Sequence, residues 1–133
     1  MIVAIMIGRK GSTGLPGKNT IQVNGEPMAA WPLKAATLVT DIERLYVSTD
    51  DPALEEIARR YNARMITRPA ILASDEALGE DAFKHAHEMI RCDLGPQAIT
   101  VEMYVLLMAN AVTITPAQIS QGITKLRSNP DAD

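Results

Sequence analysis

Apolar residues along this chain form short runs in some segments and stripes at three- and four-residue spacing in others. Segments 2–7, 44–48, 64–67 and 98–108 are typical of strands, the first and last because their apolar residues run almost without interruption. The stripes predict helices over about 31–39, 52–61, 79–92 and 117–126. A short extended piece at 21–23 ends at the turn pair Asn24-Gly25. This order of strands and helices indicates an α/β fold with a mainly parallel sheet.

The same periodicity places individual side chains in the expected core. Leu38 and Met89 fall on the apolar stripes of their helices, and Cys92 is interpreted as a small core residue. Pro32 would cost the first helix a hydrogen bond and kink it if it lay in the helix interior. The regular helix is therefore expected to start near Trp31.

Helix starts carry recognisable capping residues. Asp50 or Asp51 is expected to cap the helix that begins at Pro52, because an acidic side chain can accept a hydrogen bond from the first helical turn. Capping is therefore the preferred role for this acidic pair, ahead of catalysis. Thr115 is expected to cap the last helix in the same way.

Much of the candidate chemistry lies in segment 8–19, which follows the first strand and reads GRKGSTGLPGKN. Its four glycines end the strand and let backbone N–H groups approach a ligand closely. Arg9, Lys10 and Lys18 add three positive charges within ten positions. The combination suits the phosphate chain of a nucleotide, and a solvated turn that carries charge is the alternative interpretation.

Composition narrows the classes of protein to consider. The length of 133 residues fits one domain, and 47% hydrophobic with 22% charged residues is ordinary for a globular protein. A net charge of −3 favours neither nucleic acid nor membrane surfaces as partners, since both would select a broad basic patch. One cysteine forms no internal disulfide, and the N-terminal apolar run is too short for a membrane span. We therefore expect a cytoplasmic protein without a signal peptide.

Residues 5–19 as a whole resemble the nucleotide-binding loop of the acylneuraminate cytidylyltransferases, the CMP-sialic acid synthetase family, with its pattern R-x-G-S-K-G-x-P-x-K-N. Thr13 stands where that family usually has a lysine, while Lys10, between Arg9 and Gly11, adds a positive charge nearby. The S-T-D turn at 48–50 and the segment RPAILASD at 68–75 also resemble the family. Eight positions of the loop match: Arg9, Gly11, Ser12, Gly14, Leu15, Pro16, Lys18 and Asn19.

The resemblance implies a Rossmann-like three-layer α/β/α sandwich of the nucleotide-diphospho-sugar transferase type. It also implies transfer of CMP from CTP to a sialic-acid-like or related keto-sugar acid, with release of pyrophosphate. Arg9 and Lys18 would then be catalytic by neutralising the triphosphate. Mg²⁺ is the implied cofactor, with unknown ligands, and a homodimer is the implied assembly. Nucleotide- or substrate-binding roles fall on Gly8, Gly11, Ser12, Thr13, Gly14, Asn19, Arg68, Asp75 and Asn110.

Two of these residues have further interpretations. Arg68 would contact the base or ribose of CTP, and its structural alternative is a salt bridge to Asp50 or Asp75. Asn110 is the one polar side chain expected at the end of the last strand, where it would meet the sugar or a metal-bound water. The family's segment L-L-Q-P-T-S-P-L-R corresponds to this region, but Met108 replaces the glutamine, so specificity for sialic acid does not carry over.

Three alternative functions stay open. Residues 11–18 nearly spell the P-loop motif, although the spacing is one residue too long and an asparagine replaces the magnesium-binding hydroxyl. A nucleotidyltransferase of the same fold could use another base or acceptor. A catalytically silent nucleotide-binding or assembly module would bind CTP without turnover. Since family members run on beyond residue 133, we expect this domain to be an N-terminal part.

Overall fold

The computed structural model describes residues 1–11, 15, 17–74 and 79–132. Its centre is a four-stranded sheet with the order β5-β4-β1-β6, in which each neighbouring pair is parallel. A separate antiparallel hairpin joins β2 (Gln22–Val23) to β3 (Glu26–Pro27) through the predicted turn at Asn24-Gly25. The predicted α/β fold with a mainly parallel sheet is confirmed. The sheet consists of β1 (Ile2–Ile7), β4 (Ile42–Thr49), β5 (Arg64–Thr67) and β6 (Met103–Met108).

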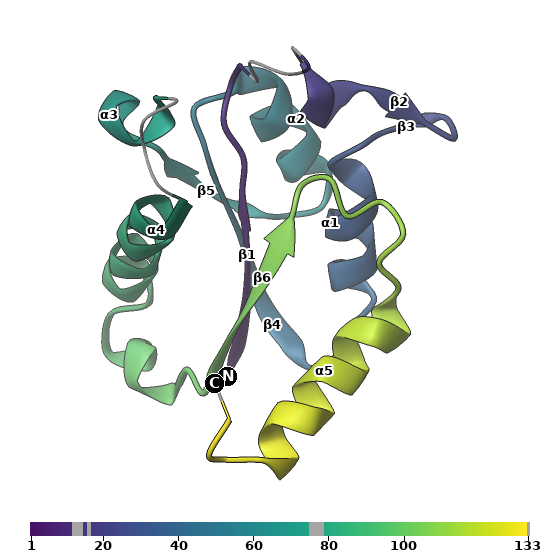
Figure 1. Cartoon of the computed structure of the whole chain (residues 1–133). Coiled ribbons are helices and arrows are strands. Elements are labelled where there is room, and N and C mark those ends of the chain that lie inside the picture. Colours follow the sequence, from purple (N-terminus) through teal and green to yellow (C-terminus); the bar gives the residue numbers. More distant parts are fainter. Residues whose placement is uncertain (12–14, 16, 75–78, 133) are drawn as a thin grey trace.

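Helices cover both faces of the sheet and give the molecule three layers (Figure 1). One face packs against α4 (Gly79–Leu94). The other face packs against α1 (Ala30–Thr37), α2 (Pro52–Arg60) and α5 (Pro116–Ser128). Shorter helical pieces are η1 (Lys18–Thr20), α3 (Ala70–Ala73) and η2 (Gly95–Thr100).

Strand β1 is buried on both faces because it lies inside the sheet, between the two helical layers. Ile2, Ala4 and Met6 belong to the core beneath α1, α2 and α5. Val3 and Ile5 belong to the core beneath α4. Successive side chains of a strand point to opposite faces, so a central strand between two helical layers needs apolar residues at each position. This explains the uninterrupted apolar run that predicts it.

The expected helix caps are present. Asp51 accepts a hydrogen bond from the backbone N–H of Ala53 at 3.0 Å and caps α2. Thr115 and Gln118 form a reciprocal capping box at the start of α5, with donor–acceptor distances of 2.9 and 3.1 Å. Both helices therefore start where the sequence predicts, within a residue.

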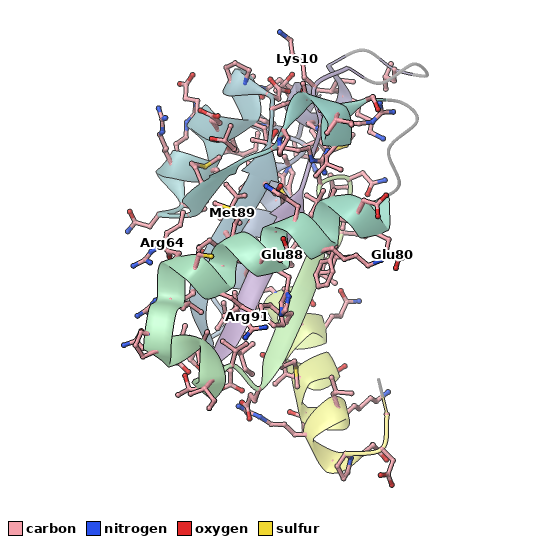
Figure 2. The ribbon with its side chains drawn as sticks, turned by 90° about the vertical axis from the view of Figure 1, so that its left-hand side faces the viewer. Lys10, Arg64, Glu80, Glu88, Met89 and Arg91 are labelled. Carbon is pink, nitrogen blue, oxygen red and sulfur yellow. The ribbon has the colours of Figure 1, made fainter. Side chains whose placement is uncertain are left out.

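Helix α4 corrects two core assignments. Its buried residues Ala82, Ala86, Ile90 and Leu94 recur at four-residue spacing, which directs Met89 and Cys92 to solvent. Met89 and its neighbours Glu88 and Arg91 are labelled on this helix in Figure 2.

In the described part of the chain, no helix is long and apolar enough to cross a membrane.

Helix α1 also differs from its prediction. It begins at Ala30, so Pro32 lies in the first turn, where a backbone N–H has no intrahelical partner and its loss costs nothing. The earlier start places Leu33 and Ala36 in the core. Leu38, expected inside, is 64% exposed.

Strand β6 begins later than the sequence pattern predicts. Residues 98–100, expected to begin the strand, belong to η2, which starts at Gly95 with a φ of 55°. Ile99 is 91% exposed, so its apolar side chain does not indicate a buried strand. Pairing with β1 starts only at Met103. The strand is therefore six residues long instead of eleven.

Candidate functional site

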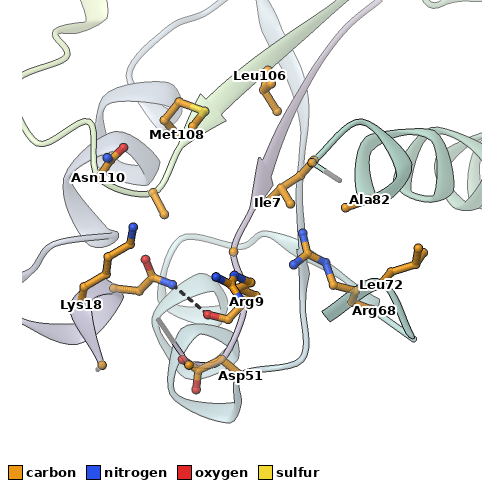
Figure 3. A pocket seen from close by; sticks show the side chains of 16 residues that line it. Ile7, Arg9, Lys18, Asp51, Arg68, Leu72, Ala82, Leu106, Met108 and Asn110 are labelled. Carbon is orange, nitrogen blue, oxygen red and sulfur yellow. Dashed lines mark hydrogen bonds between the residues drawn. The ribbon is translucent and has the colours of Figure 1, made fainter. Parts of the chain in front are cut away.

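A cavity of about 350 Å³ opens where the carboxyl ends of the sheet strands meet (Figure 3). Segments far apart in the sequence form its wall, because parallel strands bring their ends to one edge. Ligands bind at this edge in open α/β sheets. The lining residues are Ile7, Gly8, Arg9, Gly11, Gly17, Lys18, Asn19, Asp51, Arg68, Leu72, Gly79, Ala82, Leu106, Met108, Ala109 and Asn110.

The structure brings together most of the predicted site residues. Those that line the cavity are Gly8, Arg9, Gly11, Lys18, Asn19, Arg68 and Asn110. The remaining four, Ser12, Thr13, Gly14 and Asp75, lie outside the described residues.

The end of β4 holds two of the cavity's segments in place. The backbone N–H of Gly8 donates to the carbonyl of residue 48 at 3.0 Å, and that of Arg68 donates to the carbonyl of residue 49 at 3.1 Å. The next residue, Asp50, accepts a hydrogen bond from the backbone N–H of Lys10 at 2.6 Å. The S-T-D turn therefore positions the segment after β1 and the segment after β5 relative to each other.

Gly8 and Asn19 shape the segment that follows β1. A Cβ atom at Gly8 would lie 2.3 Å from Cδ2 of the buried Leu54, so any larger residue here would require Leu54 or the backbone to shift. The side-chain amide of Asn19 donates to the carbonyl of Arg9 at 3.3 Å, and Asn19 is buried. After Lys18 the chain makes only the short η1 and then enters β2. This path differs from the long helix that follows a P-loop lysine.

Arg68 is unusual because it is a cation with only 6% of its surface exposed. Its Nε atom has no hydrogen-bond partner within the described residues. Burial lowers the pKa of the guanidinium, while the charge of Asp50 opposes and that of Arg9 reinforces this change. Arginine nevertheless stays protonated in proteins. The side chain therefore lines the cavity as a buried charge with a hydrogen-bond donor to spare.

The described wall of the cavity carries more positive than negative charge. Arg9, Lys18 and Arg68 contribute three cations, and Asp51 is the one carboxylate among the described lining residues. Asp51 keeps its negative charge while it caps α2, but the cations still outnumber the carboxylates among the described lining residues. Such a wall attracts an anionic ligand such as a polyphosphate.

One side of the cavity is apolar, which the sequence did not reveal. Leu106 and Met108 are 49% and 58% exposed at the end of β6, and both line the cavity. Ile7 lies beside Met108 on β1 and lines it too. Helix α4 contributes Ala82. The sequence predicts that these residues lie near a strand end, but it does not show that their side chains point into the cavity.

A family model described as cytidylyltransferase matches residues 3–131. The chain belongs to the cytidylyltransferase family. It is 36% identical over 85 residues to the N-acylneuraminate cytidylyltransferase of Escherichia coli O18:K1:H7, covering 64% of this chain and 20% of that relative. It is 31% identical to the 3-deoxy-manno-octulosonate cytidylyltransferase of Rhodopseudomonas palustris, covering 93% and 46% respectively. The chain thus spans less than half the length of these curated relatives.

Solved structures agree on the fold. CMP:2-keto-3-deoxy-manno-octonic acid synthetase, solved in complex with CTP, matches with a TM-score of 0.71 and 24% identity. The match covers 97% of this chain and 48% of that one. A cytidylyltransferase from Leptospira borgpetersenii matches with a TM-score of 0.71 and 16% identity, covering 96% and 49%. The expected Rossmann-like cytidylyltransferase fold is therefore confirmed.

Proposed function

We propose that this chain is the nucleotide-binding part of an enzyme that transfers CMP from CTP to a sugar acid and releases pyrophosphate. The observation that carries the proposal is the convergence of Arg9, Lys18 and Arg68 on one cavity at the strand ends of a cytidylyltransferase fold. The relatives named for N-acylneuraminate and 3-deoxy-manno-octulosonate indicate the class of acceptor.

In this reaction a hydroxyl oxygen of the acceptor attacks the α-phosphorus of CTP. A new phosphorus–oxygen bond forms as the hydroxyl loses its proton to solvent, and the bond from the α-phosphorus to the bridging oxygen breaks, so that pyrophosphate leaves with the electron pair. Catalysis of phosphoryl and nucleotidyl transfer depends mainly on positioning and on stabilising the charge of the phosphate oxygens. Arg9 and Lys18 would supply that charge, and backbone N–H groups of the glycine-rich segment would add hydrogen bonds.

Arg68 and Asn19 would bind the cytidine. Arg68 lines the cavity, and a guanidinium can donate hydrogen bonds to a carbonyl oxygen of a pyrimidine. The buried amide of Asn19 holds the carbonyl of Arg9 and so couples the nucleoside side to the phosphate side. This arrangement favours a ligand that carries both a base and a phosphate chain.

Magnesium remains a separate proposal that rests on the family resemblance. Mg²⁺ is usually held by one or two carboxylates together with substrate phosphate oxygens. Within the described residues, no group of three or more His, Cys, Asp or Glu side chains is placed to hold a metal. Asp51 lines the cavity but caps α2. The carboxylates that would hold Mg²⁺ therefore stay unassigned, and no step above depends on the ion.

Calorimetric titration with CTP, UTP, ATP and GTP tests the nucleotide assignment, with and without Mg²⁺. CTP should bind most tightly, and the changes Arg9→Ala, Lys18→Ala and Arg68→Ala should each weaken it about tenfold or more, as loss of a charged hydrogen bond does. Arg59→Ala is the matched control, because Arg59 is an exposed arginine on α2 that pairs with Glu55. Equal affinity for all four nucleotides, or none for any, would contradict the assignment.

Pyrophosphate release separates the remaining alternatives. With CTP and a panel of eight- and nine-carbon keto-sugar acids, an active enzyme releases pyrophosphate only when its acceptor is present. CTP binding without release for any acceptor selects the catalytically silent nucleotide-binding module. Release with another nucleotide or alcohol selects a related nucleotidyltransferase. Sedimentation of the same sample tests the proposed homodimer.

A further inference from the structure

Two buried polar atoms at the ends of neighbouring strands have no hydrogen-bond partner within the described residues. They are Oγ of Ser48, after which β4 ends, and Nε of Arg68, just beyond β5. Ser48 is 0% exposed and Arg68 only 6%. An enclosed hydroxyl without a partner is costly, and an enclosed charged donor is more so. Native proteins pair such groups with other protein groups or with ordered water.

Both side chains lie on the face of the sheet that α4 covers. Tyr46 packs in the core beneath α4, and Ser48 follows it by two residues on β4, so both point to that face. Ile66 belongs to the same core, and Arg68 follows it by two residues. The backbone N–H of Arg68 still donates to the carbonyl of residue 49, which continues the ladder between the two strands. In that ladder Ser48 pairs with Ile66.

The side chain of Ile7 links the two positions. Ile7 pairs with Ser48 in the register of β1 and β4 and packs against the core beneath α4. Figure 3 shows the guanidinium of Arg68 beside Ile7, and both residues line the cavity. Ser48 and Arg68 are therefore neighbours of the same side chain, with Ser48 behind the cavity wall.

The guanidinium of Arg68 has an enclosed end and an open end. Of its three nitrogens, Nε alone is both enclosed and without a partner in the described part of the chain. The side chain as a whole lines the cavity. Because a guanidinium is a rigid planar fork, a hydrogen bond at Nε fixes the direction of the two terminal nitrogens. The partner of Nε therefore decides where the terminal N–H groups point.

We infer, on the basis of the proposed function, that Ser48 is the positioning residue of Arg68. One buried water accepts the hydrogen bond of Nε and donates to Oγ of Ser48, since the two atoms do not bond directly. This bridge holds the terminal nitrogens toward the cytidine before the nucleotide arrives. Arg68 is then pre-organised, and CTP binding does not have to order it.

Calorimetric titration of CTP into the full chain tests this inference. Ser48→Ala should weaken CTP binding about threefold to tenfold, the range for one neutral hydrogen bond. In an Arg68→Met background the same change should have no further effect, because the hydroxyl acts only through Arg68. Ser48→Cys keeps the size of the side chain but replaces the hydroxyl by a weak thiol, so it should behave like Ser48→Ala.

Tyr46→Phe is the matched control. It removes another buried hydroxyl from the same face of β4, but that hydroxyl donates to Asp93 at 2.6 Å, and Tyr46 does not line the cavity. CTP affinity should therefore stay unchanged. Thermal unfolding shows that each variant folds.

The Nε–H signal of Arg68 in NMR spectra gives a readout that needs no nucleotide. A bonded, enclosed N–H exchanges slowly with solvent, so the signal should be visible in the unmodified chain and in Tyr46→Phe. It should broaden or disappear in Ser48→Ala. An unchanged signal in Ser48→Ala would overturn the inference, whatever the CTP affinities are.

The outcomes separate this inference from the proposed function. CTP affinity of the unmodified chain is measured first, and a lack of binding refutes the proposed function. When that chain binds CTP, equal affinity of Ser48→Ala refutes the inference alone, and so do Ser48→Ala and Arg68→Met effects that add fully. An Arg68→Met variant that binds CTP as tightly as the unmodified chain also overturns it, because Ser48 would then have no binding residue to position.

Discussion

The change Gly8→Ala tests how tightly the glycine-rich segment packs against α2. The added Cβ would lie 2.3 Å from Cδ2 of Leu54, whereas carbon atoms in contact are normally about 3.5–4.0 Å apart. One of the two groups must therefore move by more than about 1 Å. Leu54 is fully buried, so it has no solvent-filled space to enter. We expect a loss of about 1–3 kcal/mol in the free energy of unfolding, the usual cost of overpacking a core.

A double-mutant cycle isolates the contact. Leu54→Ala alone should cost about 2–5 kcal/mol, since it leaves a cavity. In that background the alanine at position 8 gains room, and its penalty should largely disappear. The pair should therefore be less destabilising than the sum by about 1–3 kcal/mol. Urea unfolding followed by circular dichroism measures all four species.

Gly122→Ala is the matched control for this cycle. Gly122 lies exposed within α5, and a Cβ there meets nothing within 4 Å. Alanine should stabilise the chain by up to about 1 kcal/mol through helix propensity. Gly8→Ala as stable as the parent, or strictly additive with Leu54→Ala, would refute the steric argument and show that this segment adapts.

Three further changes probe the core and the site. Burial and Asp93 raise the pKa of the Tyr46 hydroxyl to about 12 in the folded chain. The unfolded chain therefore releases this proton at a lower pH than the folded chain does. The free energy of unfolding should fall between about pH 10 and 12, by at most about 2.7 kcal/mol. Tyr46→Phe should remove that fall in urea unfolding, and an unchanged profile would contradict it. Hydrogen bonds from Tyr46, and to a lesser extent from Arg64, hold the pKa of the Asp93 carboxyl below its usual value. The carboxylate therefore stabilises the folded chain above that usual pKa, and this contribution is lost as the pH falls through the folded-state pKa. Asp93→Asn should flatten this acid limb, whereas an equally steep limb would assign it to other carboxylates. Arg68→Met should weaken CTP about tenfold or more while leaving the unfolding free energy equal or higher, because it removes a buried cation; a loss of stability would instead make Arg68 structural.

The sequence predicts most of the architecture because local signals and the tertiary fold agree there. β1 and β5 and the start of α2 match their predictions, since buried runs, proline and capping residues act over a few positions. The prediction fails where only the packed neighbour decides. Ile99 is apolar yet almost fully exposed in η2. Leu38 and Met89 point outward because the exact phase of a helix depends on the layer it meets.

The candidate site shows the same division. Parallel strand ends meet at one edge, so the grouping of Arg9, Lys18, Arg68 and Asn110 could be anticipated from strand order alone. The burial of Arg68 could not, because an arginine after a strand is usually exposed. The apolar side of the cavity, which includes Leu106, Met108 and Ile7, also escaped prediction. Leu106 and Leu107 are adjacent leucines, and only the pleat of β6 decides that Leu107 enters the core while Leu106 lines the cavity.

The three hydrogen bonds at residues 48–50 make β4 a shared anchor for the segments that would grip the nucleotide, and none of these bonds involves β6. The end of β6 is instead held by its pairing with β1, where Met108 lies beside Ile7. Residues 106–110 could be exchanged, by evolution or by an engineer, to accept a new alcohol while the same nucleotide continues to be delivered.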